Sequence, residues 1–338
     1  MRLRSTLAIL VALLVATDSV HAGDPTTSKP DEPLAKTFSM EKARDTFDAM
    51  SLHWIEQHKC GSCHTTYPYL MVRPALKDPA AQERGRAFLE KRITSWDSGK
   101  KEDKPRGDTE IVATAAVLAV NDALTTSKLQ PLTRQTLDRM WTLQQPNGSW
   151  DWYKCGWPPF ELDDYYGAVF AAVGVGHAPE GYAQTEKAKA GLKKLREYFK
   201  NTPPPNLHHE AWLLWASLKL DGLFSKEEQK KTIKKLLALQ REDGGWSLAS
   251  MAKWEGQAGP VDAKKAPSDG YGTGFTVFVL RQAGVPASDP AIQRAVAWLK
   301  SNQRESGQWF TYSLNESRHH FIAHAGTAYA LLALKACE

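Results

Sequence analysis

The chain has 338 residues, of which 42% are hydrophobic and 24% are charged. This is enough apolar content for a large buried core and too much for a disordered protein. Its 43 basic and 38 acidic residues are interspersed and give a net charge of +5, so no basic block indicates a nucleic-acid partner. Four cysteines are too few for a disulfide scaffold of this length.

The N-terminus has the features of a secretory signal. Two arginines in the first four residues precede an apolar run at 7–16, and the small-x-small pattern Val20-His21-Ala22 follows. We expect a signal peptide at 1–22, a flexible leader at 23–36 and one folded domain at 37–338. Because the run is about half of a ~20-residue membrane span, we expect no integral span after cleavage and a periplasmic or secreted protein. An uncleaved anchor is the alternative.

Three copies of the motif Gln-x-x-x-Gly-x-Trp repeat along the chain and predict helix ends. Each copy closes an apolar segment of helical period. The glycine can take a positive φ just beyond the helix, and the tryptophan can fold back over the junction with a neighbouring helix. The copies begin at Gln144, Gln240 and Gln303, and Gln57 with Gly61 forms an altered fourth copy.

The spacing of these copies leaves room for six helical hairpins. Amphipathic outer helices would cover inner helices that are almost wholly apolar, and such inner helices bury their faces best in a closed ring. We therefore predict an all-α fold, an (α/α)6 toroid in a single domain, with an open solenoid as the alternative. Inner helices are expected at 109–120, 167–175, 210–220, 274–283 and 325–336.

The three boxes resemble the QW repeats of squalene–hopene cyclases and related terpenoid cyclases. The resemblance extends from about Lys42 to the C-terminus. It implies the α/α toroid that these cyclases share with the β-subunits of protein prenyltransferases. A fold of this kind does not by itself specify a function.

The segment Cys60-Gly-Ser-Cys63-His64 has the spacing of a c-type haem attachment site. Two thiols at this separation can form thioethers with the vinyl groups of haem, and the adjacent imidazole can bind the iron. We expect one covalent haem c per chain, attached through Cys60 and Cys63, with His64 as the proximal ligand. A Cys60–Cys63 disulfide and half of a zinc site are the alternatives.

The second axial ligand of such a haem is left open by the sequence. Met71 follows His64 by seven residues, and packing in the core is its alternative role. In a closed ring the last repeat adjoins the first, so His319, His320 and His324 are also candidates. An open iron site is the remaining alternative.

Polar residues precede each inner helix and would gather at one end of the ring. Among them, Glu161-Leu-Asp163-Asp164 resembles the Asp-x-Asp-Asp motif of squalene–hopene cyclases. That resemblance implies Asp163 as an acid that protonates an alkene, with Asp164 beside it. Capping of a helix is the alternative role for residues of this polar group, in particular for Asp108 and Asp269. Glu161 and Tyr165 depart from the cyclase pattern, and the chain has residues for one toroid where those cyclases have two. The other residues of this group are Asp108, Glu110, His208, His209, Glu210, Asp269 and Tyr271.

Function follows most directly from the haem motif. We expect electron transfer, or redox chemistry or ligand binding linked to the haem, with a redox partner protein. The alternatives are a terpenoid-cyclase-like enzyme and a toroid that binds a small apolar or terpenoid-like ligand without catalysis. The remaining thiols, Cys155 and Cys337, either pair or have separate roles.

Overall fold

The computed structural model describes residues 28–76, 80–96, 106–256, 259–260, 262, 266–315 and 320–338. Its outer helices are α1 (Met40–His58), α3 (Ala80–Ser95), α5 (Pro131–Thr142), α7 (Glu186–Asn201), α9 (Lys226–Ala238) and α11 (Pro290–Ser301). Its inner helices are α2 (Thr66–Val72), α4 (Arg106–Thr125), α6 (Asp164–His177), α8 (Leu207–Ser217), α10 (Gly270–Gln282) and α12 (Ile322–Ala336).

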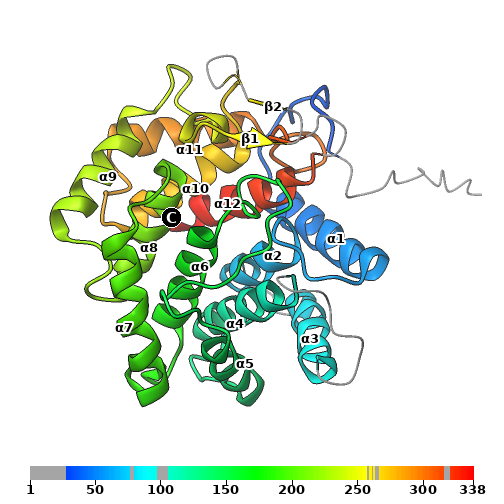
Figure 1. Ribbon diagram of the computed structural model, residues 1–338. Helices are drawn as coiled ribbons and strands as arrows, with labels where there is room; N and C mark the ends of the chain where they lie inside the picture. Colours follow the sequence, from blue (N-terminus) through cyan, green and yellow to red (C-terminus); the bar gives the residue numbers. More distant parts are fainter. Residues whose placement is uncertain are drawn as a thin grey trace, which may run out of the picture.

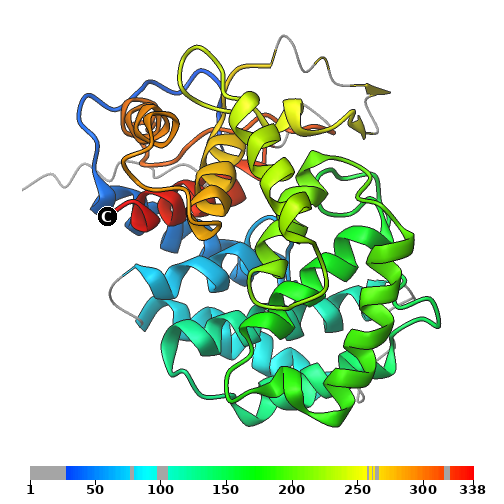
Figure 2. The ribbon, with the colours of Figure 1, turned by 90° about the vertical axis from the view of Figure 1, so that its left-hand side faces the viewer.

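Short elements connect these helices. Three 3-10 turns are η1 (Arg73–Ala75), η2 (Tyr182–Gln184) and η3 (Leu248–Met251). The strands β1 (Glu255–Gly256) and β2 (Gly259–Pro260) pair in antiparallel fashion. Figure 2 shows this small hairpin projecting beyond the helices on one side of the molecule.

The six inner helices form a closed ring, with the outer helices around it (Figure 1). Each inner helix contacts the next in sequence, and α12 contacts both α10 and α2. The inner helices α4, α6, α10 and α12 are buried along almost their whole length, whereas the outer helices α7 and α11 bury a single stripe. The predicted α/α toroid of six hairpins is confirmed, and closure rules out the open solenoid.

Each Gln-x-x-x-Gly-x-Trp box is a turn that clamps two outer helices. In the first box, Gln144 Nε2 donates to the carbonyls of Gly148 (2.9 Å) and of Gly191 on α7 (3.0 Å). Gly148 has φ +99°, and Trp150 Nε1 donates back to Met140 O at 2.9 Å. The same bonds recur at Gln240 and Trp246 and at Gln303 and Trp309. The roles of the glycine and the tryptophan agree with the sequence prediction, whereas the clamping role of the glutamine is a structural finding.

The altered fourth copy does not form this turn. Helix α1 ends at His58, and Lys59 takes the left-handed conformation with φ 51°. Gly61 is required for a different reason, because a Cβ at this position would lie 2.5 Å from Tyr67 Oη. The first hairpin therefore uses its glycine for close packing inside the haem motif.

The N-terminal residues that the structure describes are held against the last repeat. Leu34 forms a β-bridge with Arg304, and Ala35 N donates to Gln303 O at 2.8 Å. Residues 28–36 of the expected flexible leader are thus tied to the box that begins at Gln303. The expected signal peptide and residues 23–27 lie outside the described residues. No described helix combines the length and apolar character that a membrane span needs.

Candidate functional site

Cys60, Cys63 and His64 line one cavity of about 360 Å³ at the end of the ring where the inner helices begin. The segment before α2, the first turns of α4 and α12, and residues 153–161 ahead of α6 form its walls. Neither thiol of the motif is paired. The volume falls within the range of about 300–1,000 Å³ that small-molecule pockets occupy. The structure therefore brings the three predicted haem-binding residues to one open space.

His64 is oriented by hydrogen bonds and by aromatic rings. Its Nδ1 lies 2.8 Å from Thr65 Oγ1, which lies 2.9 Å from Nδ1 of His324. Trp54 contacts the imidazole edge-on, and Phe321 stacks on it. Burial, followed by the neighbouring histidines, lowers the pKa of His64 to about 3. The imidazole is therefore neutral at pH 7, and its bond to Thr65 leaves Nε2 as the nitrogen that can coordinate a metal.

Of the candidate distal ligands that the structure describes, Met71, His320 and His324 are not among the residues that line this cavity. His324 is linked to His64 through Thr65 and so lies behind the imidazole. Met71 faces two other cavities, further along the ring axis. His320 Nδ1 accepts a hydrogen bond from Ser313 N at 3.1 Å, and His319 lies outside the described residues. Six side chains from residues 153–161 also line the cavity.

A third thiol lies in the same cavity. Cys155 Sγ donates to Glu161 Oε2 at 2.6 Å, and both residues line the cavity with Cys63. Burial and then the Glu161 carboxylate raise the pKa of Cys155 to about 12 and that of Cys63 well above its usual value. These sulfurs therefore remain protonated at neutral pH. Within the described part of the chain, no three His, Cys, Asp or Glu side chains converge as a metal site, so the half zinc site gains no partner ligands there.

Two arginines, Arg92 and Arg106, also line the cavity. The sequence did not point to either of them. Arg92 makes a bidentate ion pair with Glu110, with N–O distances of 2.5 and 2.6 Å. The guanidinium of Arg106 lies 5.9 Å from the ring centroid of Tyr153. Guanidinium groups recognise carboxylates through paired hydrogen bonds. No local sequence pattern identified these residues, because α3 and α4 meet the motif only in the folded ring.

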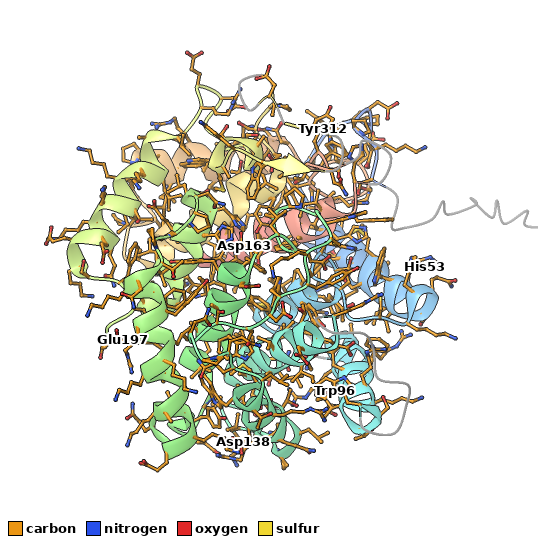
Figure 3. The ribbon with its side chains drawn as sticks, in the orientation of Figure 1. His53, Trp96, Asp138, Asp163, Glu197 and Tyr312 are labelled. Atoms are coloured by element: carbon orange, nitrogen blue, oxygen red, sulfur yellow. The ribbon has the colours of Figure 1, made fainter. Side chains whose placement is uncertain are left out.

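The acidic motif is engaged in structural bonds. Asp163 lies near the middle of the ring (Figure 3) and caps α6 by accepting from Tyr166 N at 2.9 Å. Its Oδ1 is also 3.2 Å from Nε2 of the buried His209. Burial raises the pKa of Asp163, but the bonds from His209 and the α6 backbone outweigh burial, and the net pKa is lowered. Asp164 pairs with Lys154 at 2.5 Å. This geometry favours an ionised Asp163, whereas a general acid must hold a proton.

Three other polar residues that precede inner helices, His208, Asp269 and Tyr271, form hydrogen bonds in the buried interior of the protein. His208 Nε2 lies 2.8 Å from Tyr271 Oη, and Asp269 accepts from the amides of Gly272 and Leu248 at 2.7 Å each. Burial raises the pKa of Asp269 to about 6. These contacts join inner helices and loops. Asp269 is the N-cap of α10, and the contact between His208 and Tyr271 joins α8 to α10.

Aromatic side chains occupy the interior of the ring. Trp212 on α8 contacts Tyr166 on α6 and Phe275 on α10, and it reaches Tyr329 on α12 with a centroid distance of 6.2 Å. All four side chains are buried. Tyr166 and Tyr329 also enclose, together with Cys63 and Met71, a space of only about 10 Å³. The middle of the ring is therefore packed at this level.

Comparisons with known proteins agree with the fold. No protein-family model matches the chain. The chain is 33% identical to the squalene–hopene cyclase of Zymomonas mobilis over an alignment of 115 residues, which covers 32% of this chain and 15% of that enzyme. A polysaccharide lyase structure covers 87% of this chain and 97% of its own, with a TM-score of 0.50 and 13% identity. A type II terpene cyclase from Scytonema, in complex with geranylgeranyl dihydroxybenzoate, covers 81% of this chain and 87% of its own, with a TM-score of 0.48 and 12% identity. The likeness to the lyase shows the fold alone, and the match to the squalene–hopene cyclase covers only a small part of that enzyme.

Proposed function

We propose that the protein carries one covalently attached haem in the cavity at the start of the inner helices and acts as a redox protein of the cell envelope. The observation that carries this proposal is the meeting of two unpaired thiols and a neutral imidazole, at the c-type attachment spacing, in a cavity of about 360 Å³. The chemistry of the donor set fits the group. When bound, haem supplies a one-electron iron couple.

The chain's own residues would have distinct tasks at this site. Cys60 and Cys63 would form the two thioethers, and His64 Nε2 would bind the iron while Thr65 fixes the imidazole through Nδ1. Arg106 lines the cavity and would attract a haem carboxylate, whereas the Arg92 guanidinium is already paired with Glu110.

Aromatic rings would limit the access of water to the imidazole. Trp54 and Phe321 pack on His64 from two directions. A dry environment of this kind raises the influence of each nearby charge on a redox couple. Electron exchange with a partner protein would then take place at this end of the ring, where the cavity opens.

A pyridine haemochrome spectrum tests the proposal on protein expressed with the cytochrome c maturation system. We expect a haem band that survives acid–acetone extraction in the wild type and is lost when Cys60 and Cys63 are both replaced by alanine. Cys337→Ala is the matched control, because Cys337 lies at the end of α12 and outside the residues that line the cavity. An extractable band, or no band, in the wild type contradicts the proposal.

The similarity to squalene–hopene cyclase supports a second candidate function, which is the binding of an apolar or terpenoid-like ligand, with or without its conversion. Asp163 would be the acid in such an enzyme, with Asp164 beside it. Its bonds to His209 and Tyr166 favour the ionised state, and the packed rings around Trp212 leave little room for a polyprene. We therefore favour binding over cyclisation. Incubation of the wild-type protein with squalene should give no cyclic product. A cyclic product that is formed by the wild type and lost in Asp163→Asn would support the cyclase hypothesis instead.

A further inference from the structure

The outer helices α7 and α9 carry an excess of positive charge that the rest of the chain lacks. Helix α7 has six basic and two acidic side chains, and α9 has five basic and two acidic side chains. Together they have a net charge of +7, which exceeds the +5 of the entire chain, so all other residues sum to −2. Positive charge is therefore concentrated on one part of the surface.

These two helices are neighbours on one flank of the ring. Figure 1 shows α7 and α9 at the left of the molecule, and Figure 2 presents this side to the viewer. The loop that leads into α9 is tied to α7, because Arg196 Nε donates to the carbonyl of Asp221 at 2.8 Å. We call Glu186–Asn201 and Lys226–Ala238 together the basic flank.

Three of the four carboxylates within the basic flank are already engaged. Glu186 pairs with Lys189 at 3.5 Å, and Glu227 pairs with Lys230 at 3.0 Å. Glu228 forms the capping box of α9. These groups offset only part of the positive charge, since the flank has many more cations than acids.

Neighbouring elements neutralise two further lysines. Lys187 lies 3.7 Å from Asp138 of α5, and Lys235 lies 2.6 Å from Glu210 of α8. The fourth carboxylate of the flank is Glu197, on the outer side of α7 in Figure 3. Five exposed lysines then remain without a carboxylate partner among the described residues. They are Lys193, Lys194, Lys200, Lys231 and Lys234.

The composition of the basic flank fits a diffuse layer of negative charge better than a shaped protein partner. Ten of its eleven basic residues are lysines. Protein–protein interfaces are enriched in arginine and aromatic residues and depleted in lysine. The two aromatic residues of the flank, Tyr198 and Phe199, pack against Tyr165 of α6. Lysine is a compact, hydrated point charge that does not require the paired geometry of an arginine–carboxylate contact.

We propose that the basic flank binds the surface of an anionic lipid bilayer through its exposed lysines. Clustered lysines are attracted to such a surface, whose phosphate groups form a dense negative layer. The proposal is independent of the haem, because no residue of the flank lines the cavity that contains Cys60 and Cys63. The first hairpin lies across the ring from the flank (Figure 1), so it would face away from the bilayer.

Co-sedimentation of the full-length protein with lipid vesicles tests this proposal. We expect binding to vesicles made of phosphatidylglycerol and phosphatidylcholine in equal parts, and much weaker binding to vesicles of phosphatidylcholine alone. Binding should weaken steeply as salt is added, because at 0.1 M salt charges are screened beyond about 10 Å. Attachment through the apolar run at 7–16 would be common to both kinds of vesicle and to every variant.

A test variant with four substitutions locates the contact. It carries Lys193→Gln, Lys194→Gln, Lys231→Gln and Lys234→Gln, all at exposed positions. Each lysine that reaches an anionic surface contributes about fivefold in affinity, so we expect the binding to fall by more than about a hundredfold.

The matched control removes the same charge from exposed lysines outside the basic flank. It carries Lys36→Gln, Lys42→Gln, Lys91→Gln and Lys128→Gln. This control should bind anionic vesicles almost as tightly as the wild type, because its substitutions leave the flank intact.

Three results would overturn the proposal. The first is an absence of wild-type binding to the anionic vesicles at low salt. The second is an equal loss of binding in the test variant and in the control, which would reflect total charge and not the flank. The third is binding of the wild type to soluble polyglutamate but not to vesicles, which would assign the flank to an acidic protein.

Discussion

At the scale of the residue, the haem motif is shaped by its neighbours as much as by its own spacing. Cys60, Cys63 and His64 could be predicted because the attachment chemistry fixes their separation. Thr65 and Arg106 could not, since their contacts depend on which helices meet in the folded ring. For the acidic motif, the sequence was misleading about the chemistry. The resemblance implies a proton-donating acid at Asp163, whereas hydrogen bonding to the buried His209 of α8 lowers the pKa of Asp163.

Gly61 allows a test of the packing inside the motif. An alanine Cβ there would lie 2.5 Å from Tyr67 Oη, and Tyr67 is itself 3% exposed. We expect Gly61→Ala to lower the free energy of unfolding by about 1–3 kcal/mol through overpacking. Adding Tyr67→Phe should recover part of this loss in urea denaturation. Strictly additive effects of the two substitutions would show that the contact is not the cause.

Asp269 predicts a pH dependence of stability. Its pKa is raised to about 6 in the folded protein, against 3.8 for a free side chain. The folded state therefore holds the extra proton, and the stability that Asp269 contributes is complete below pH 4 and lost as the pH rises through 6. The loss is about 3 kcal/mol. Relative to Asp269→Asn, the wild type should become less stable between pH 4 and pH 7 in denaturant titrations. A difference that stays constant with pH would contradict this interpretation.

At the scale of the element, the repeat boxes were the most predictable part of the fold. Their spacing indicates a helix end, a positive-φ glycine and a buried tryptophan, and Gly148 and Trp150 have these properties. The glutamine clamp was not predictable, because its second acceptor is a carbonyl 47 residues away on α7. The altered copy at Gln57 departs from the pattern, since Lys59 replaces glycine as the left-handed residue.

The boxes predict large losses of stability when the tryptophan is removed. Trp150, Trp246 and Trp309 are each at most 1% exposed, and each donates to a carbonyl ten residues earlier. Replacement of any one by alanine should cost about 3–5 kcal/mol. Thermal or chemical unfolding measures this directly, with the exposed Tyr312→Ala as a control for loss of an aromatic ring. Losses near zero would mean that the rings do not support the helix junctions.

At the scale of the whole molecule, the closing contact joins the two ends of the described chain. Sequence patterns predicted six hairpins, but a ring and a solenoid share the same local pattern. Two contacts make the structure a ring and not a solenoid. Helix α12 contacts α2, and the side chain of Gln303 accepts from the backbone N–H of Ser39 and donates to its C=O (2.8 and 2.9 Å). The position of the cavity that contains Cys60 and Cys63 follows from closure, because it collects residues from the first and last hairpins.

Gln303→Leu tests this closure. It removes both bonds to Ser39 and should lower the free energy of unfolding by about 2 kcal/mol. It should also speed hydrogen exchange at residues 28–39, which lie against the last repeat. Gln144→Leu is the matched control, since it breaks the equivalent clamp between α5 and α7 without touching the junction. Equal exchange at residues 28–39 in the two variants would argue against a special role for Gln303.

The central claim is that a haem is covalently attached to the first hairpin of a closed toroid. The mass of the peptide that contains Cys60 and Cys63 tests this claim most directly. Protein made with a working attachment machinery is digested and analysed by mass spectrometry. We predict that this peptide carries the added mass of one haem. The same peptide at its unmodified mass, with both thiols open to alkylation, would contradict the account.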